Sequence, residues 1–569
     1  MNTAGKLLTV GAMAFVIGLP FVLRKGEAPS RFAEDTVVII TPHTESIRYE
    51  FGRAFREWYR VRTGRSVYVD YRVIGGTSEI SKFLDSEYTN SFRNYWEGEL
   101  GREWTLDVQE AFLNRSLVPD DSPGDDTPAE AARRAFLASE LSSGIDIVFG
   151  GGAYDFTSMA SRGLLVDAGL LDRHPDWFQE TATPGTVPRA IPRINAGETL
   201  YDARGRWYGA VLSTYGIVYN RDSLRRLGIP VEPRQWPDLT DPRYFGEIAI
   251  CDPSKSGSMT QAFEMIIQQQ MQLAVDEGLR AKGEGLRTKE GDNDYPDLSP
   301  SPLALRPYLE SGWMRGMEII QKISANARYF TDASQKVNID VGMGDCAAGM
   351  TIDFYGRFQQ ENILERSGDP RFGFHTPAGG STVSADPLGL LRGARNRAVA
   401  EAFIEFVLSL EGQKLWNFRL GTPGGPETFA LRRPPIRPEL YSDQWNHYRS
   451  DASYNPYLAS ADFHYHAEWT SPLFSEIRTI IRVCFMDVRA ELTEAWGAII
   501  KARREGRAED ADRAEALLTD LSRISYSEAM TTIDAALKAP RIEEVRLARV
   551  LSEHFRRQYL AARDMARGH

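Results

Sequence analysis

Three glycine-rich turns stand directly before segments whose apolar spacing predicts helices. The turns are "VIGGTSEISKFL", "VFGGGAYDF" and "CDPSKSGSMTQAFEMI", and they contribute Gly75, Gly76, Thr77, Ser78, Gly150, Gly151, Gly152, Ser256, Gly257 and Ser258. Such a turn offers unpaired backbone N–H groups at the positive end of a helix dipole, and both favour an anion. The turns are therefore candidate contacts for an anionic ligand.

A plain helix cap is the alternative for each turn. Glu79 favours that alternative at the first turn, because a carboxylate in the first helical turn uses the dipole that an anionic ligand would need. No GxxxxGK[ST] motif follows a strand, and "GMGDCAAG" fails the GxGxxG spacing, so phosphate-loop and dinucleotide motifs are excluded.

Motifs of hydrolases and metalloenzymes are missing as well. The chain has no GxSxG elbow, no HExxH and no grouping of His, Asp and Ser near a nucleophile. In "FHYHAEW", His464, His466 and Glu468 would share one face of a strand, but two surface histidines in an aromatic loop are the favoured interpretation. We therefore expect a protein without catalytic activity, cofactor or metal.

Each of the three turns follows an apolar run typical of a strand, and helix-like segments follow the turns. Strand, helix and strand alternate within about forty residues at the start of this region, which is the rhythm of a parallel α/β sheet. Ligands collect at the carboxyl ends of the strands in such sheets. A chain of 569 residues exceeds the usual size of one core, so at least two lobes are expected.

Charge and cysteine content exclude further classes. The formal charge of -11 argues against nucleic acid as a partner, because a phosphate backbone is held mainly by clustered Lys and Arg. Cys251, Cys346 and Cys484 lie far apart without CxxC spacing, so structural thiols are expected and at most one disulfide can form.

The N-terminal segment "LLTVGAMAFVIGLPFVL", residues 7–23, carries no charge and lies between Lys6 and Arg24. This pattern indicates an export signal. No A-x-A cleavage site follows it, so a cleaved signal peptide and an uncleaved membrane anchor both remain open for residues 1–30.

Several long segments together resemble a known family. The segments are "GRWYGAVLSTYGIVYNRDSLRRLGIP", "QWPDLTDPRYFGEIAICDPSKSGS" and "ADPLGLLRGARNRAVAEAFIEFVLSLEGQKLW". They are similar to the family 1 extracellular solute-binding proteins of ABC importers, in the branch related to ferric-iron-binding periplasmic proteins. The similarity runs over about residues 37–420.

The resemblance implies an α/β fold of the type II periplasmic binding proteins, in which two lobes joined by crossing strands close on a ligand. It implies a first lobe from residues 36–212 and 371–440 and a second lobe from residues 213–370. A charged insertion at residues 85–143 contains the loop "VPDDSPGDDTP", and a second insertion loop is expected at residues 274–302. Residues 441–569 have amphipathic helical spacing and form a C-terminal helical extension.

The resemblance also implies the ligand-binding residues. Ser213, Thr214 and Tyr215 lie where the family crosses between lobes, and iron-binding members hold Fe(III) through two adjacent tyrosines after a stretch like "DCAAGM". Here Phe354 and Tyr355 stand at those positions after Asp353, so one phenolate is missing and ferric iron is in doubt. An iron site of Asp353, Tyr355 and His43 remains the nearest alternative.

The expected function is capture of a small anionic solute by the binding component of an ABC importer, in the periplasm or on the outer face of the cytoplasmic membrane. The expected ligand contacts are His43, Gly75–Ser78, Gly151, Gly152, Ser213–Tyr215, Ser256–Ser258, Asp353 and Tyr355. Its expected partners are the solute and an ABC permease. A ligand-sensing or scaffold module with the same fold is the alternative from another class.

Overall fold

The computed structural model describes residues 33–119, 126–281 and 302–568. The apolar segment at residues 7–23 lies outside these ranges. Among the residues that the structure describes, no helix combines the length and the apolar composition needed to cross a membrane.

The first sheet has the strand order β2-β1-β3-β14-β4, and β8 pairs with β14. Strands β1, β2 and β3 run parallel, while β14 runs antiparallel to β3, β4 and β8. The strands are β1 (Asp35–Ile40), β2 (Val67–Arg72), β3 (Ile147–Phe149), β4 (Leu165–Val166), β8 (Tyr208–Ser213) and β14 (Ser384–Leu391).

The second sheet has the order β11-β10-β12-β9-β13. It consists of β9 (Tyr215–Asn220), β10 (Ile248–Cys251), β11 (Ala327–Thr331), β12 (Ala348–Ile352) and β13 (Phe372–His375). Only Thr214 separates β8 in the first sheet from β9 in the second. The chain returns between β13 and β14, so it joins the first sheet again after His375 rather than at residue 371. The predicted two-lobed α/β fold is confirmed.

Alternating side chains of β1 explain why helices cover both faces of the first sheet. Val37 and Ile39 pack with Phe51 of α2 (Glu45–Thr63), whereas Ile40 packs on the opposite face with Ile80 of α3 (Thr77–Asn94). Further helices of the two lobes are α6 (Ala153–Arg162), α9 (Gly257–Ala281), α10 (Pro302–Asn326), α11 (Ser334–Met343), α12 (Asp353–Ser367), α13 (Arg397–Leu408) and α14 (Leu410–Asn417).

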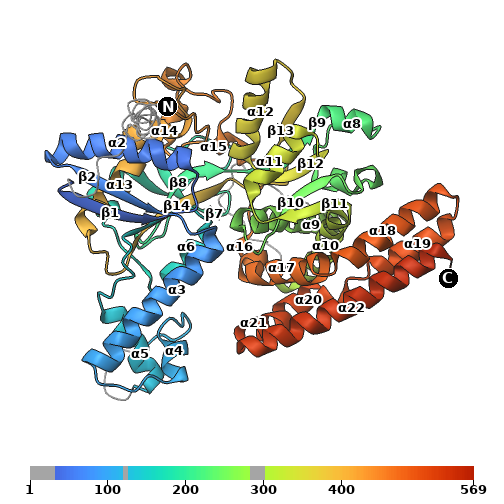
Figure 1. Cartoon of the computed structure of the whole chain (residues 1–569), viewed down its shortest axis with the longest axis horizontal. Coiled ribbons are helices and arrows are strands. Elements are labelled where there is room, and N and C mark those ends of the chain that lie inside the picture. Colours follow the sequence, from blue (N-terminus) through green and yellow to red (C-terminus); the bar gives the residue numbers. More distant parts are fainter. Residues whose placement is uncertain (1–32, 120–125, 282–301, 569) are drawn as a thin grey trace, which may run out of the picture.

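The insertion at residues 85–143 is mainly helical. Helix α3 projects from the first sheet in Figure 1 and carries α4 (Leu106–Ala111) and α5 (Pro128–Ala138) at its far end. Phe92 stacks on Phe112 at a centroid distance of 4.7 Å, and both rings lie against Phe136. These aromatic residues belong to one core with Ile40 of the sheet. In the second insertion, α9 continues to Ala281, past the expected start of the loop at residue 274.

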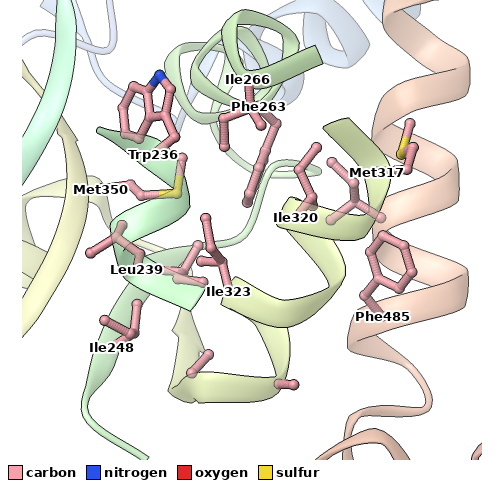
Figure 2. Close-up of a cluster of buried hydrophobic side chains, with 14 of the residues drawn as sticks. Trp236, Leu239, Ile248, Phe263, Ile266, Met317, Ile320, Ile323, Met350 and Phe485 are labelled. Carbon is pink, nitrogen blue, oxygen red and sulfur yellow. The ribbon is translucent and has the colours of Figure 1, made fainter. Parts of the chain in front are cut away.

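The C-terminal extension is helical, as predicted, and shares one hydrophobic core with the second sheet. Its helices include α17 (Phe474–Ile480), α18 (Arg489–Arg504), α19 (Ala508–Leu518) and α22 (Arg541–Arg567). Phe485 of the extension reaches the cluster that contains Met317 and Ile320 of α10 (Figure 2). Buried hydrogen bonds add to this contact: Trp496 Nε1 donates to Asn326 Oδ1 at 2.8 Å, and Trp313 Nε1 donates to the carbonyl of Ile524.

Two other local predictions differ from the structure. His464 and His466 lie outside any strand, because the chain there leads into the short helix α16 (Ala467–Thr470) and His466 stacks on Trp469. The single helix expected across "RAVAEAFIEFVLSLEGQKLW" is divided at Ser409, whose extended backbone and side-chain hydrogen bond to Gly412 N begin α14. All three cysteines are free and buried, as expected.

Candidate functional site

A cleft of about 500 Å³ lies where elements of the two lobes meet. Most residues predicted to bind ligand line it: His43, Gly75, Gly76, Thr77, Gly151, Gly152, Ser213, Tyr215, Ser256, Gly257, Ser258 and Tyr355. Three predicted residues, Ser78, Thr214 and Asp353, are outside the lining. The three glycine-rich turns therefore do converge, although they are separated by up to about 180 positions in the sequence.

Six helices begin at the wall of the cleft. The residues at their N-termini that line it are Thr44 (α2), Gly76 (α3), Gly152 (α6), Ser256 (α9), Ala333 (α11) and Ile352 (α12). The first amides of a helix have no intrahelical partner. In the described part of the chain, the cap residues of α2, α3, α6, α11 and α12 provide no side-chain acceptor for these amides. In α12 the first two amides are already engaged, because Asp353 N donates to the carbonyl of Thr214 and Phe354 N donates to Asp353 Oδ1. The other helix starts give the cleft wall N–H donors, and all six place positive dipole ends there.

Glycine is required at two of the turns by the backbone itself. Gly75 has a φ of 143° and Gly151 a φ of 146°, and residues that carry a Cβ rarely adopt such values. Gly76 has ordinary extended backbone, but a Cβ there would lie 2.6 Å from the carbonyl oxygen of Lys255 on the second lobe. Gly76 therefore permits a close approach between the lobes.

A buried ion pair forms part of the floor of the cleft. Asp386 Oδ2 lies 2.6 Å from Arg433 Nη1 and 3.2 Å from His43 Nε2, and the backbone N–H of Gly151 donates to Asp386 Oδ1. Burial opposes ionisation of Asp386, but the charge of Arg433 and the hydrogen bonds from His43 and the Gly151 amide outweigh burial and hold its pKa well below its usual range. Arg433 is fully buried and also donates to Ser213 Oγ at 2.8 Å.

Sequence reasoning missed Asp386 and Arg433. The available signals were an aspartate inside the apolar run "ADPLGLL" and an arginine beside prolines in "LRRPPIR". It also missed Lys255, whose Nζ lies 3.8 Å from Glu79 Oε1 across the cleft, and Gln261.

A hydrogen-bonded chain leads from the cleft into the protein. Tyr215 Oη lies 3.0 Å from both Ser384 Oγ and Gln261 Oε1, and Gln261 Nε2 donates to Glu198 Oε1. Glu198 belongs to β7 (Glu198–Thr199), which forms a small sheet with β5 (Phe178–Thr181) and β6 (Ile191–Asn195).

Asp353 and Tyr355 are placed differently from each other. Tyr355 lines the cleft, and burial raises the pKa of its phenol to about 12. Asp353 is fully buried, its backbone N–H donates to the carbonyl of Thr214, and burial raises the pKa of its carboxyl to about 6. No group of three or more His, Cys, Asp or Glu side chains arranged to hold a metal ion occurs within the described ranges.

Comparison with known proteins relates this cleft to a family. Residues 143–435, more than half of the 569 residues, match the family described as bacterial extracellular solute-binding protein. The phosphoglycerate transport regulatory protein PgtC of Salmonella typhimurium is 24% identical over 252 residues, which are 44% of this chain and 50% of PgtC. An uncharacterized protein of Haemophilus influenzae is 22% identical over 213 residues, 37% of this chain and 48% of that protein.

This chain therefore matches about half the length of these curated relatives. Among solved structures, the periplasmic binding protein AfuA of Actinobacillus pleuropneumoniae, with exogenous fructose-6-phosphate bound, is 16% identical with a TM-score of 0.39. That alignment covers 67% of this chain and 82% of AfuA. The resemblance seen in the sequence is confirmed by the family match, and the chain belongs to the bacterial extracellular solute-binding proteins.

Proposed function

We propose that this protein captures a small, anionic, oxygen-rich solute between its two lobes and delivers it to the permease of an ABC importer, without catalysis. The observation that carries this proposal is the convergence of six helix N-termini on one cavity. Phosphate and carboxylate oxygens accept hydrogen bonds from such amides and benefit from the helix dipoles.

The charged side chains of the cleft are largely paired and leave the selection of an anion to the helix amides. Asp386 is balanced by Arg433, and Glu79 faces Lys255. Asp332 also lines the cleft and opposes an anion, but the helix amides from both lobes remain as donors. The name of PgtC, a relative by sequence, connects that protein with phosphoglycerate transport and is compatible with a phosphorylated solute here.

Closure of the lobes provides a way to signal occupancy. The chain crosses between the lobes at Thr214 and between β13 and β14, and it passes again from the core of the first lobe to that of the second after Tyr457. Gly76 of the first lobe approaches Lys255 of the second. A solute that contacts both sides favours the closed arrangement, which a permease can distinguish from the open one. The family description is compatible with action in the periplasm or on the outer face of the membrane.

Ferric iron has less support as the cargo. Tyr355 lines the cleft, but Asp353 does not, and Asp386 is already engaged by Arg433. A trivalent ion needs several free anionic oxygens. Ligand sensing is the better-supported second function, because PgtC is named a regulatory protein and because the extension gives the second lobe a large additional surface.

Native mass spectrometry of the full-length protein purified from its own cells tests the proposal. We expect a co-purified organic phosphate or carboxylate that is released when the protein unfolds. A neutral or cationic solute would contradict the anionic assignment. A visible charge-transfer band after addition of ferric citrate, abolished by Tyr355→Phe, would instead support the iron-binding function.

A further inference from the structure

A second cavity, of about 340 Å³, adjoins the cleft, and we call it the side chamber. Thr44, Ile47, Gln335, Phe354 and Tyr355 line both spaces. The side chamber therefore lies directly beside the cleft, at the start of α12 and of α2.

The lining of the side chamber is mainly apolar, unlike the polar turns of the cleft. Phe358, Phe429 and Leu431 form much of it, and Glu45 is the single charged residue among those that line it. Phe358 is 45% exposed and Phe429 is 38% exposed. Large aromatic side chains left open to solvent in one concave place commonly mark a binding surface.

Phe354 stands at the boundary between the two spaces. Its ring stacks against Tyr355 at a centroid distance of 4.1 Å, and the guanidinium of Arg433 lies 4.3 Å from its centroid. Arg433 in turn pairs with Asp386 in the floor of the cleft. Phe354 thus lies between the apolar side chamber and the ion pair of the cleft.

We propose that the side chamber receives a hydrocarbon part of the solute, which makes the ligand an amphiphilic anion: an alkyl or aryl phosphate or carboxylate. This inference rests on the proposed function, since the anionic end would occupy the cleft. A bare phosphate or acetate ion would leave both cavities largely filled with water, whereas an added ring would displace water from Phe358 and Phe429.

Isothermal titration of the full-length protein with two pairs of probes tests this. The pairs are methyl phosphate with phenyl phosphate, and acetate with 3-phenylpropionate. We expect the aryl member of at least one pair to bind about tenfold more tightly than its small partner, because it buries apolar area that the partner lacks.

Substitutions in the side chamber test its contribution to binding separately from that of the cleft. In the double variant Phe358→Ser with Phe429→Ser, the affinity for the aryl probe should fall to that for its small partner. The affinity for the small partner should stay unchanged. Leu364→Ser is the matched control, because Leu364 lies on the same helix, is 46% exposed and is outside the lining of the side chamber. It should leave both affinities unchanged.

The outcomes distinguish this inference from the function on which it rests. Equal affinities within both pairs would overturn the proposed role of the side chamber while leaving anion capture intact. An aryl preference that survives the double substitution would do the same. A double variant that weakens both members equally would show a general structural effect and would also overturn it. Failure of all four anions to bind would overturn the proposed function and this inference together.

Discussion

Gly76 shows how one missing side chain can control an approach between lobes. Its backbone is extended, which any residue adopts, so Gly76→Ala should change the free energy of unfolding by less than about 0.5 kcal/mol. The new Cβ would lie 2.6 Å from the carbonyl oxygen of Lys255, however, and must push the lobes apart. We expect about tenfold weaker binding of the co-purified solute, equivalent to about 1.4 kcal/mol, by isothermal titration.

Gly98 offers the matched control for this substitution. A Cβ at Gly98 meets no atom within 4 Å, so Gly98→Ala should leave solute affinity unchanged. Equal affinities for the two variants would mean that the turn at Gly76 is only a helix cap.

Individual residues differ in how well the sequence predicted them. The glycine-rich turns were predictable because a strand followed by a glycine-rich helix start is a local pattern with a local meaning. The pair of Asp386 and Arg433 was not, because its partners lie 47 positions apart and meet only after β14 has joined the first sheet. Asp353 was misplaced because the first residue of a helix can face either the ligand or the core.

At the scale of elements, β7, α9 and the start of the extension meet at two buried glutamates. Glu198 on β7 is 3% exposed and Glu264 on α9 is 1% exposed. Tyr465 and Thr470 of the extension donate hydrogen bonds to Glu264 Oε1, and Gln261 donates to Glu198. Burial, followed by the charge of Glu264, raises the pKa of Glu198 to about 8, and burial raises the pKa of Glu264 to about 7.

This contact predicts a loss of stability with rising pH. The folded protein keeps the proton on Glu198 up to about pH 8, whereas the unfolded chain releases it near the ordinary glutamate pKa of 4.5. The folded state therefore binds more protons in this window, and its free energy of unfolding falls as pH rises from about 5 to 8. Glu198→Gln should reduce this slope by about 1 kcal/mol per pH unit, measured by urea unfolding at several pH values.

Glu57→Gln is the control for the pH experiment. The Glu57 side chain is 60% exposed on α2, so its substitution should leave the slope as it is. The same slope in Glu198→Gln and in the unchanged protein would show that Glu198 is ionised in the folded state at neutral pH.

Helical periodicity in the sequence predicted which segments are helices better than it predicted where each helix ends and what it packs against. The stripe of Leu492, Trp496 and Ile499 in α18 is buried as its spacing indicates. For the insertion, only the loop "VPDDSPGDDTP" between helices was predicted. The charged composition hides the spacing of Tyr88, Phe92 and Trp96, which form a core with two further helices. Ser409 ends α13 because its side chain accepts the Gly412 amide and starts a new helix.

At the scale of the whole molecule, the second lobe and the extension are one hydrophobic unit. Phe555 of α22 is fully buried in the cluster that also contains Trp236 and Ile248 of the second lobe. Phe555→Ala should lower the free energy of unfolding by about 3 kcal/mol. Hydrogen exchange should then show reduced protection in β10 and α9 as well as in α22, because they share this core.

Val550→Ala on the same helix is the control, since Val550 is 58% exposed and should change stability by less than about 0.5 kcal/mol. Loss of protection confined to α22 would show that the extension unfolds separately. The sequence predicted the helices of the extension but not the core that they share with the second lobe. Amphipathic spacing shows that one face of a helix is buried without showing what covers it.

The extension also reaches the first lobe. Tyr154 of α6 stacks on Phe474 of α17 at a centroid distance of 4.4 Å, and its hydroxyl lies 3.2 Å from Ser475 Oγ. In the closure mechanism proposed above, the first lobe cannot swing away from the second without sliding or separating this pair of rings. The difference in free energy between the open and closed forms then includes the free energy of breaking or shifting a contact that lies outside the cleft. Solute affinity is therefore tuned in part by side chains that never touch the solute.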